Sequence, residues 1–264
     1  MSPSLGKLPR QMLERVVLKQ LGFKRDDVLL GPRFGEDAAL LKVNGKILAA
    51  SSDPLTGAAR RVGWLAVHAN ANDIATRGIR PRWFLSNILL PRNASETAIR
   101  AICGEVHRAC KQLHIAIVGG HCEYMETLAH PIVVGCMLGT AEGRRIVSCG
   151  NAKVDDELIL TKAAGIEGTA ILASTFRRLL RRKFGSTFVT VATRYDRWVS
   201  VVEDALAAFN AAEVHAMHDP TEGGLAGGVH ELAEAAGVGF IVEEKKVPVH
   251  RETLSPRGSR ILEY

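Results

Sequence analysis

Residues 35–54 read GEDAALLKVNGKILAASSDP, and this stretch predicts a β-hairpin. Asn44-Gly45 is the strongest two-residue signal for a hairpin turn, because both turn positions favour positive φ angles. Carboxylates from both strands are then expected at the open end of the hairpin. The pairs predicted by this turn are Val43–Lys46, Leu41–Leu48, Ala39–Ala50, Asp37–Ser52 and Glu36–Asp53.

Like charges gathered at one end of a hairpin destabilise the fold unless a positive charge sits among them. A hard divalent cation such as Mg²⁺ meets that need, because it prefers carboxylate oxygens. The alternative is that these acids are solvated strand ends without a ligand. In a regular hairpin Asp37 and Asp53 point to opposite faces, so Gly35 or Pro54 must bend the chain if both hold one ion.

Composition narrows the class of protein. The 264 residues are 47% hydrophobic and carry a net charge of +6, which suits an anionic small substrate as well as nucleic acid. Five cysteines without a CxxC pair argue against a zinc site or a disulfide framework and favour free thiols in a reducing cytoplasm. The first residues lack the apolar core of a signal peptide, and no apolar run is long enough to cross a bilayer, so no membrane partner is expected.

Residues 60–76 predict a helix with an apolar side. Asn70, Asn72 and Asp73 lie within it, although such side chains compete for backbone hydrogen bonds and disfavour helices. They either satisfy buried polar groups or face water, or Asp73 is a further ligand for metal or phosphate.

The segment 115–118 predicts a buried strand that leads into Gly119-Gly120-His121-Cys122-Glu123. Paired glycines allow the backbone to approach a ligand closely, and His121 and Glu123 would then supply polar contacts. The alternative is a glycine turn with an exposed histidine. Cys122 is expected to be a small packed residue, because no base partner is specified for a nucleophile. Apolar helical spacing places Cys103 and Cys110 in the core as well.

A polar stretch at 142–154 marks the best domain boundary, which gives domains 1–146 and 147–264. The second half is expected to start with a strand at 158–161. The basic run at 177–183 is interpreted as a solvated helix face, with binding of phosphates or nucleic acid as the less favoured reading. In His218-Asp219-Pro220-Thr221-Glu222-Gly223-Gly224, backbone amides before a helix can hold phosphate, with Asp219 near the metal.

Taken together, these motifs resemble the aminoimidazole ribonucleotide synthetase (PurM-like) superfamily. Five ordered motifs are far more specific than any one of them. Members of the superfamily include the hydrogenase-maturation carbamoyl dehydratase, thiamine-monophosphate kinase and selenophosphate synthetase. The hydrogenase-maturation branch and archaeal AIR-synthase-related proteins are most similar. The matching stretches are Gly35-Glu36-Asp37-Ala38-Ala39, Ser52-Asp53-Pro54, Asn72-Asp73-Ile74, Gly119-Gly120-His121-Cys122-Glu123 and Asp219-Pro220-Thr221-Glu222-Gly223-Gly224-Leu225.

The resemblance implies an α+β fold with an N-terminal domain whose strands form a β-barrel across a homodimer, followed by a C-terminal α+β sandwich domain. It also implies ATP and Mg²⁺ in the cleft. Asp37, Asp53 and Asp73 would hold the metal, with Asp37, Asp53 and His121 as catalytic residues. The expected contacts to the nucleotide come from Gly6 and Lys7 on an arm over the phosphates, and from Asn72, Asp73, Gly119, Gly120, Glu123 and Asp219.

The sequence also departs from the family. No cysteine follows Cys149, although the hydrogenase-maturation branch carries its substrate on a C-terminal cysteine, and the C-terminal domain looks shortened. The preferred hypothesis is an Mg-ATP-dependent enzyme that activates or phosphorylates an oxygen of a small anionic or carbamoyl-like substrate. The alternatives are a thiamine-monophosphate-kinase-like phosphotransferase, a non-catalytic nucleotide-binding or assembly partner, and, less favoured, a nucleic-acid-binding protein.

Overall fold

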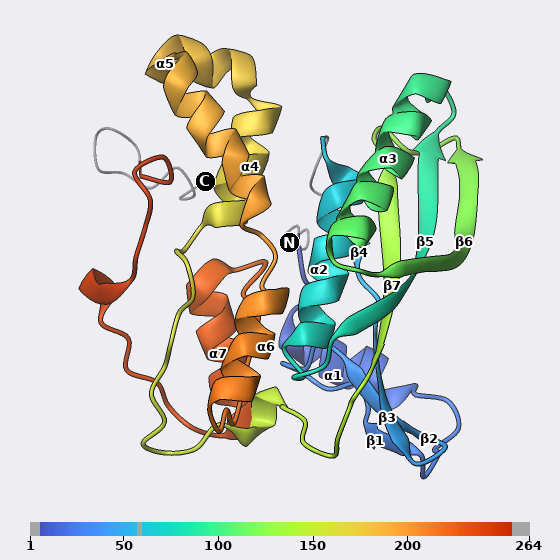
Figure 1. The fold of residues 1–264 in the computed structure, drawn as a ribbon, viewed down its shortest axis with the longest axis vertical. Helices are drawn as coiled ribbons and strands as arrows, with labels where there is room; N and C mark the ends of the chain where they lie inside the picture. Colours follow the sequence, from blue (N-terminus) through green and yellow to red (C-terminus); the bar gives the residue numbers. More distant parts are fainter. Residues whose placement is uncertain (1–5, 57–59, 255–264) are drawn as a thin grey trace.

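The computed structural model describes residues 6–56 and 60–254 (Figure 1). Its centre is a seven-stranded sheet in the order β1-β2-β3-β7-β5-β6, with the short β4 also paired to β7. Only β5 and β6 are parallel to each other. The strands are β1 (Val28–Leu30), β2 (Ala39–Val43), β3 (Lys46–Ser51), β4 (Pro54–Leu55), β5 (Pro81–Pro91), β6 (Ala116–Met125) and β7 (Ile132–Thr140).

The predicted hairpin is formed by β2 and β3. All three pairs predicted within the strands are confirmed, from Val43–Lys46 at the turn to Ala39–Ala50 at the open end. Asn44 and Gly45 have φ angles of 49° and 79°, as the turn requires. Beyond Ala39 and Ala50 the two strands part, so the pairs predicted for Asp37 and Glu36 are not formed. After Ser51 the chain moves to β7, where Pro54 pairs with Val134.

Helix α2 (Val62–Ala75) lies between the sheet and the C-terminal helices (Figure 1). Thirteen of its fourteen residues are buried, because one side packs on the sheet and the other on the second half of the chain. Ile74 and Phe84 belong to the main core on the sheet side. On the other side, Trp64 donates its indole N–H to the carbonyl of Asp196 at 3.0 Å. The helix predicted at 60–76 is therefore confirmed, and it connects the two halves.

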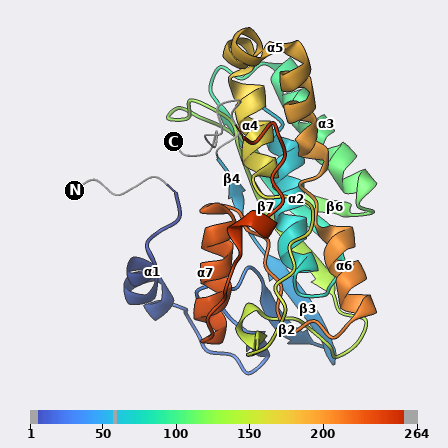
Figure 2. The same ribbon diagram turned by 90° about the vertical axis from the view of Figure 1, so that its left-hand side faces the viewer.

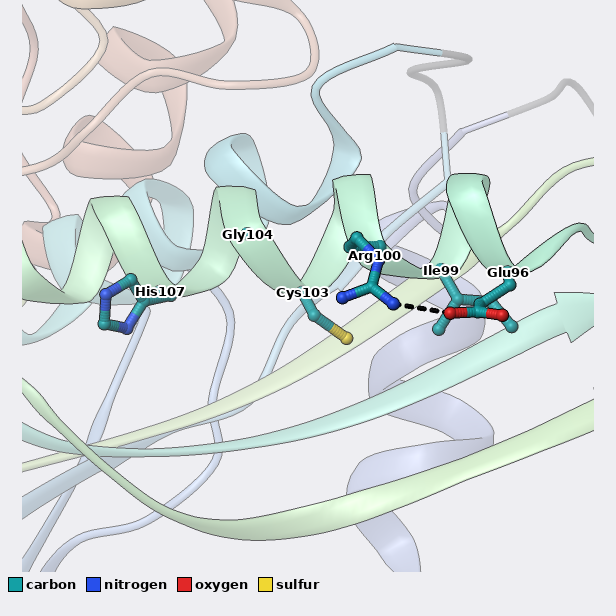
Figure 3. Close-up of a pocket in the computed structure, with 6 residues that line it drawn as sticks. All are labelled: Glu96, Ile99, Arg100, Cys103, Gly104 and His107. Atoms are coloured by element: carbon teal, nitrogen blue, oxygen red, sulfur yellow. Dashed lines mark hydrogen bonds and ion pairs between the residues drawn. The ribbon is translucent and has the colours of Figure 1, made fainter.

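Helix α3 (Glu96–Gln112) begins at Ser95, whose hydroxyl accepts a hydrogen bond from the Ala98 amide at 3.2 Å. Cys110 is buried as predicted, but Cys103 is exposed, so its assignment to the core was wrong. Figure 3 shows its side chain in an open groove along α3, beside Arg100 and His107. The two cysteines do lie seven residues apart on one helix. Only Cys110 belongs to the buried side of that helix, however, and Cys103 lies outside it.

Strand β6 differs from its prediction in two ways. It continues through Gly119 and Gly120 to Met125, so the two glycines do not form a loop. It is also an edge strand whose residues are exposed, including Cys122, which was expected to be packed. Gly120 is required where it stands, because its φ is +148° and a Cβ there would lie 2.0 Å from the carbonyl oxygen of Ser86. The glycine pair thus serves close strand pairing.

The second half of the chain is mainly helical in the part that the structure describes. The strand expected at 158–161 is not formed, because no segment among residues 6–56 and 60–254 pairs with it, and Ile159 is 80% exposed. An isolated bridge joins Ala164 to Val249. The α+β class is confirmed. The helices are α4 (Ile166–Thr175), α5 (Arg177–Thr193), α6 (Val202–Ala211) and α7 (Gly224–Ala236), with 3-10 turns at Cys149–Asn151, Arg194–Arg197 and Glu244–Lys246.

Before the sheet, helix α1 (Arg10–Val16) and a 3-10 turn (Val17–Lys19) bury no residue. Figure 2 shows α1 beside α7, and an ion pair between Arg10 and Glu234 joins them. Among the described residues, the helices are all too short or too polar to cross a bilayer.

Candidate metal and nucleotide site

Three carboxylates from distant segments meet between the two halves of the chain. Asp37 precedes β2, Asp73 lies on α2, and Asp219 lies in the loop before α7. Ligand oxygens of all three lie within 4.8 Å of one another. Asp73 and Asp219 are buried, and one oxygen of each, Oδ2, has no hydrogen-bond partner. Buried carboxylate oxygens without partners are unfavourable unless a cation or a proton joins them.

Asp53 adjoins this cluster from the connection between β3 and β4. Asn70 on α2 fixes its backbone, since the Asn70 amide accepts from the Asp53 N–H at 3.0 Å and donates to its carbonyl at 3.2 Å. The Gly135 amide on β7 also donates to that carbonyl, at 2.9 Å. Burial and the charge of Asp37 raise the pKa of the Asp53 carboxyl, which places it within the electrostatic reach of the cluster. The separation of the chain beyond β2 and β3 therefore lets residues from opposite faces of a hairpin share one site.

The electrostatics of the cluster favour a cation. Burial, together with the charge of Asp219, raises the pKa of Asp73 well above its ordinary value. Burial and the charge of Asp37 do the same to the pKa of Asp219, and to a lesser degree to that of Asp53. The atoms of this cluster that lack partners are all carboxylate oxygens, so the cluster fits a hard divalent cation such as Mg²⁺. Asp37, Asp73 and Asp219 can hold such an ion directly, with Asp53 beside them.

His218 and Glu231 extend the cluster, and sequence reasoning missed both. His218 Nδ1 lies 2.9 Å from Asp37 Oδ2, and its Nε2 lies 2.9 Å from Glu231 on α7. Burial lowers the pKa of His218, but its hydrogen bonds with Asp37, Cys149 and Glu231 outweigh this and raise the pKa to about 12. The ring is therefore a buried imidazolium that orients Asp37. Its position next to Asp219 in the sequence was the only available signal.

The N-terminal arm reaches the same network. Lys7 Nζ lies 3.2 and 3.3 Å from the two carboxylate oxygens of Glu231, and it also feels the charges of Asp37 and Asp53. Gly6 lies against Glu222, where a Cβ would approach the carboxylate to 3.3 Å. The structure thus brings Gly6 and Lys7, from the start of the chain, to the acidic cluster.

Glu36 does not join the cluster, contrary to the hairpin prediction. Its carboxylate is buried, pairs with Arg77, and accepts hydrogen bonds from the Ser148 hydroxyl and the Gly150 amide. Glu36 and the next residue therefore have different surroundings, since Asp37 lies beside Asp73 and Asp219. Arg77 is fully buried and also missing from the predicted site. Its guanidinium supplies the positive charge beside Glu36 that the hairpin prediction assigned to a metal ion.

A second group of possible ligands consists of Asp37, Cys149 and His218. Arg77 Nη2 lies 3.1 Å from Cys149 Sγ and 3.4 Å from Asp37 Oδ2. A metal ion there would face the guanidinium and the imidazolium at close range. These cations therefore exclude a second metal ion from this group. The metal site is restricted to the side of Asp37 that faces the carboxylates of Asp73 and Asp219.

Other predicted site residues lie elsewhere. The Asn72 side chain donates to the Val199 carbonyl and accepts from the Val201 amide, at 2.9 and 2.8 Å, so it joins α2 to the start of α6. Gly119, Gly120, His121 and Glu123 lie on β6, and His121 faces Glu123 at 3.5 Å on an exposed surface.

The distance between β6 and the cluster follows from the sheet. Asp53 is bonded to Gly135, which pairs with Ser86, which in turn pairs with Gly120. Three strand spacings of about 4.8 Å put Gly120 about 14 Å from Asp53. Within one chain the structure does not bring the predicted glycine loop, His121 or Glu123 to the carboxylates.

Fold and site together define a two-part α+β protein with a buried acidic cluster, suited to a cation, where its halves meet. Two family descriptions match it: AIR synthase related protein, N-terminal domain, over residues 35–141, and AIR synthase related protein, C-terminal domain, over residues 153–262. The chain belongs to the AIR synthase-related family.

Relatives among characterised proteins are distant. A putative hydrogenase expression/formation protein of Methanocaldococcus jannaschii is 25% identical over 95% of this chain and 73% of its own length. Carbamoyl dehydratase HypE of Rhizobium leguminosarum is 25% identical over 83% of this chain, which spans 63% of that relative. Thiamine-monophosphate kinase of Pyrococcus abyssi is 26% identical, over 81% and 67%.

Solved structures share the fold. AaThiL complexed with AMPPCP and TMP superposes with a TM-score of 0.72 at 21% identity, over 95% of this chain and 79% of that one. HypE in complex with ATP gives 0.67 at 22% identity, over 94% and 72%. A HypE–HypF complex gives 0.72 at 21% identity, over 91% and 75%.

Proposed function

We propose that this protein binds ATP with Mg²⁺ and uses it to activate or phosphorylate an oxygen of a small anionic or carbamoyl-like substrate. The observation that carries the proposal is the buried cluster of Asp37, Asp73 and Asp219, with two carboxylate oxygens that lack partners. Its support from relatives is that proteins of the same fold have been solved in complex with ATP and with AMPPCP.

Phosphoryl transfer requires mainly positioning and charge neutralisation from a protein. When bound, Mg²⁺ supplies neutralisation of phosphate charge. Asp37, Asp73 and Asp219 would hold it, and His218 would keep Asp37 in position. Lys7 pairs with Glu231, feels the charges of Asp37 and Asp53, and would neutralise a phosphate oxygen from the arm. The buried position of the cluster would keep bulk water away from the phosphates.

Isothermal titration calorimetry tests this proposal. ATP with Mg²⁺ is expected to bind the wild-type protein, and ATP with a chelator is not. Asp53→Asn and Asp73→Asn should each weaken binding by at least tenfold, since each removes a charge next to the ion. Asp26→Asn, on an exposed loop, is the matched control and should bind as wild type. Absence of heat with wild type at high ATP and Mg²⁺ would refute the proposal.

A second candidate is a nucleotide-binding or assembly partner without turnover. Among the described residues, the C-terminal half has no paired strand beyond one isolated bridge, and apolar side chains such as Ile159 and Ile241 stay exposed. Steady release of ADP or phosphate would exclude this alternative. Transfer of ³²P to the product would favour a kinase-like reaction, and free phosphate would favour activation followed by loss.

We also propose a homodimer joined through β6, in the cytoplasm. The edge strand exposes Ile117, Val118 and Tyr124 and leaves one row of backbone groups unpaired. A second copy of the chain on this edge would cover the exposed row of backbone groups. It would also place His121 and Glu123 next to the other subunit, where they could contribute to a site formed by both subunits. Light scattering after chromatography tests it. Tyr124→Lys should give monomers, and a monomeric wild type at micromolar concentration would contradict the proposal.

A further inference from the structure

The positive charge of this protein is concentrated on one helix. Between Gly168 and Tyr195 the sequence contains six basic residues and no acidic one. This local excess equals the net charge of the whole chain, +6, so the remaining residues carry equal numbers of acidic and basic side chains. Five of the six cations lie on the first half of α5: Arg177, Arg178, Arg181, Arg182 and Lys183.

These five cations are exposed, and within the described part of the chain none forms an ion pair with a carboxylate. Elsewhere, exposed arginines such as Arg80 and Arg92 are paired with glutamates. Figure 1 shows α5 at the end of the molecule farthest from β1 and β2, where it projects beyond the body. The helix therefore presents unneutralised charge at an accessible tip.

Helix stability does not explain this arrangement. Arg177 and Arg178 occupy the first turn of α5, where the helix dipole disfavours cations, and that turn has no acidic residue. Phe176 at the N-cap gives no side-chain hydrogen bond to the free amides. Five like charges within seven positions also repel one another. The regular backbone is interrupted at Gly185, so Arg181, Arg182 and Lys183 lie near a helix end that favours cations. The first-turn charges of Arg177 and Arg178 remain unfavourable for the isolated helix, and together with the mutual repulsion they point to an external anionic partner.

Apolar side chains lie among the cations. Phe176 and Leu179 are each 51% exposed at the same tip. The sequence of the run fits a solvated polar face, but such a face does not account for two exposed apolar side chains. A partner that is only a string of phosphates would leave them in water. An anionic layer above an apolar phase uses both kinds of side chain.

We propose that the tip of α5, residues 176–183, docks on an anionic lipid surface, with the arginines at the headgroups and Phe176 and Leu179 below them. A projecting helix reaches a flat surface without a complementary groove. This departs from the expectation that the protein has no membrane partner, and it is independent of the proposed nucleotide chemistry.

Vesicle co-sedimentation tests the proposal with the full chain. Vesicles of phosphatidylglycerol and phosphatidylcholine in equal parts are compared with pure phosphatidylcholine, at 50 and 500 mM salt. One basic side chain near an anionic surface contributes about a fivefold gain in binding. The wild type is therefore expected to bind the anionic vesicles at least 100-fold more tightly at low salt, and to lose most of that binding at high salt.

Two variants separate the contributions. A variant with Arg177, Arg178, Arg181 and Arg182 changed to Gln should lose roughly 100- to 1,000-fold in affinity for anionic vesicles. Phe176→Ser with Leu179→Ser should lose about tenfold or more, through apolar burial alone. Circular dichroism checks that each variant is folded. The control is the variant with Lys19, Lys24, Lys42 and Lys46 changed to Gln, which removes the same charge elsewhere and should bind as wild type.

Three results would overturn the proposal. Equal binding to anionic and neutral vesicles would exclude the electrostatic part, and equal losses in the control variant would mean that overall charge suffices. Tighter binding to a 20-nucleotide single-stranded DNA than to the vesicles, unchanged by Phe176→Ser with Leu179→Ser, would assign the tip to nucleic acid instead.

Discussion

Glu231→Gln tests the network that links the N-terminal arm to the acidic cluster. Glu231 lies on α7 and contacts two cations, His218 from the preceding loop and Lys7 from the arm. The substitution keeps the size of the side chain and removes its charge. We expect a loss of stability that comes mainly from the buried contact with His218.

The magnitude follows from the burial of each pair. The side chains of His218 and Glu231 are 3% and 13% exposed, so their charged hydrogen bond contributes about 2 kcal/mol. Lys7 is 51% exposed, and its pair contributes below about 1 kcal/mol because solvent screens it. The expected total is about 2–3 kcal/mol. For a chain of this size, that lowers the melting temperature by about 5–10 °C.

Urea denaturation of the metal-free protein measures the change. Glu234→Gln is the matched control, because Glu234 lies on the same helix and pairs with Arg10 of the arm in a more exposed contact. It should cost below about 1 kcal/mol. A double-mutant cycle with Lys7→Met should give a Glu231–Lys7 coupling below about 1 kcal/mol. Equal losses for Glu231→Gln and Glu234→Gln would refute the assignment of the buried contact with His218 as the main term.

Three further predictions concern the same site. Asp73→Asn should stabilise the metal-free protein at pH 7 by about 1–2 kcal/mol, because the raised pKa of Asp73 means that its charge is unfavourable in the folded state. The same substitution should remove the rise in melting temperature that Mg²⁺ causes in the wild type. Unchanged stabilisation by Mg²⁺ would contradict this. His218 binds its proton more tightly in the folded state, so the stability that this proton contributes is complete below about pH 6.5 and is lost towards pH 12. Between pH 7 and 9 the free energy of unfolding of the wild type should therefore fall by about 1.4 kcal/mol per pH unit. His218→Gln should remove this fall, as measured by urea denaturation without metal. Arg77→Met should cost about 3–5 kcal/mol by leaving Glu36 buried without its counter-charge, whereas Arg80→Met, at an exposed pair, should cost below about 1 kcal/mol in the same assay.

The hairpin was predictable because its determinants are local. A two-residue turn fixes the register, and the alternation of side chains follows from it. The meeting of Asp37 with Asp73 required the family resemblance, since nothing local connects β2 to α2. Where local reasoning was extended past the end of the strands, it failed for Glu36, because the pairing ends at Ala39–Ala50 and the Glu36 side chain pairs with Arg77.

The unpredicted residues are those whose role depends on distant partners. Arg77 and Glu36 are 41 positions apart, and Asp37 and His218 are 181 apart. No spacing rule relates such residues, and each alone is an ordinary polar side chain. The prediction of a ligand loop at the glycines of β6 failed for another reason. The pair Gly119-Gly120 fits both a ligand loop and close strand pairing. Only the register with β5 decides between them.

The charges around the site explain why metal and nucleotide would have to bind together. Three cations, Arg77, His218 and Lys7, face six carboxylates: Glu36, Asp37, Asp53, Asp73, Asp219 and Glu231. Without a cation this excess is unfavourable, which is what the raised pKa values of Asp73 and Asp219 express. Phosphates would add negative charge to a site that already has too much, so nucleotide binding would require divalent cations among these carboxylates. Affinity for ATP should therefore rise with Mg²⁺ concentration and, below neutral pH, fall with acidity.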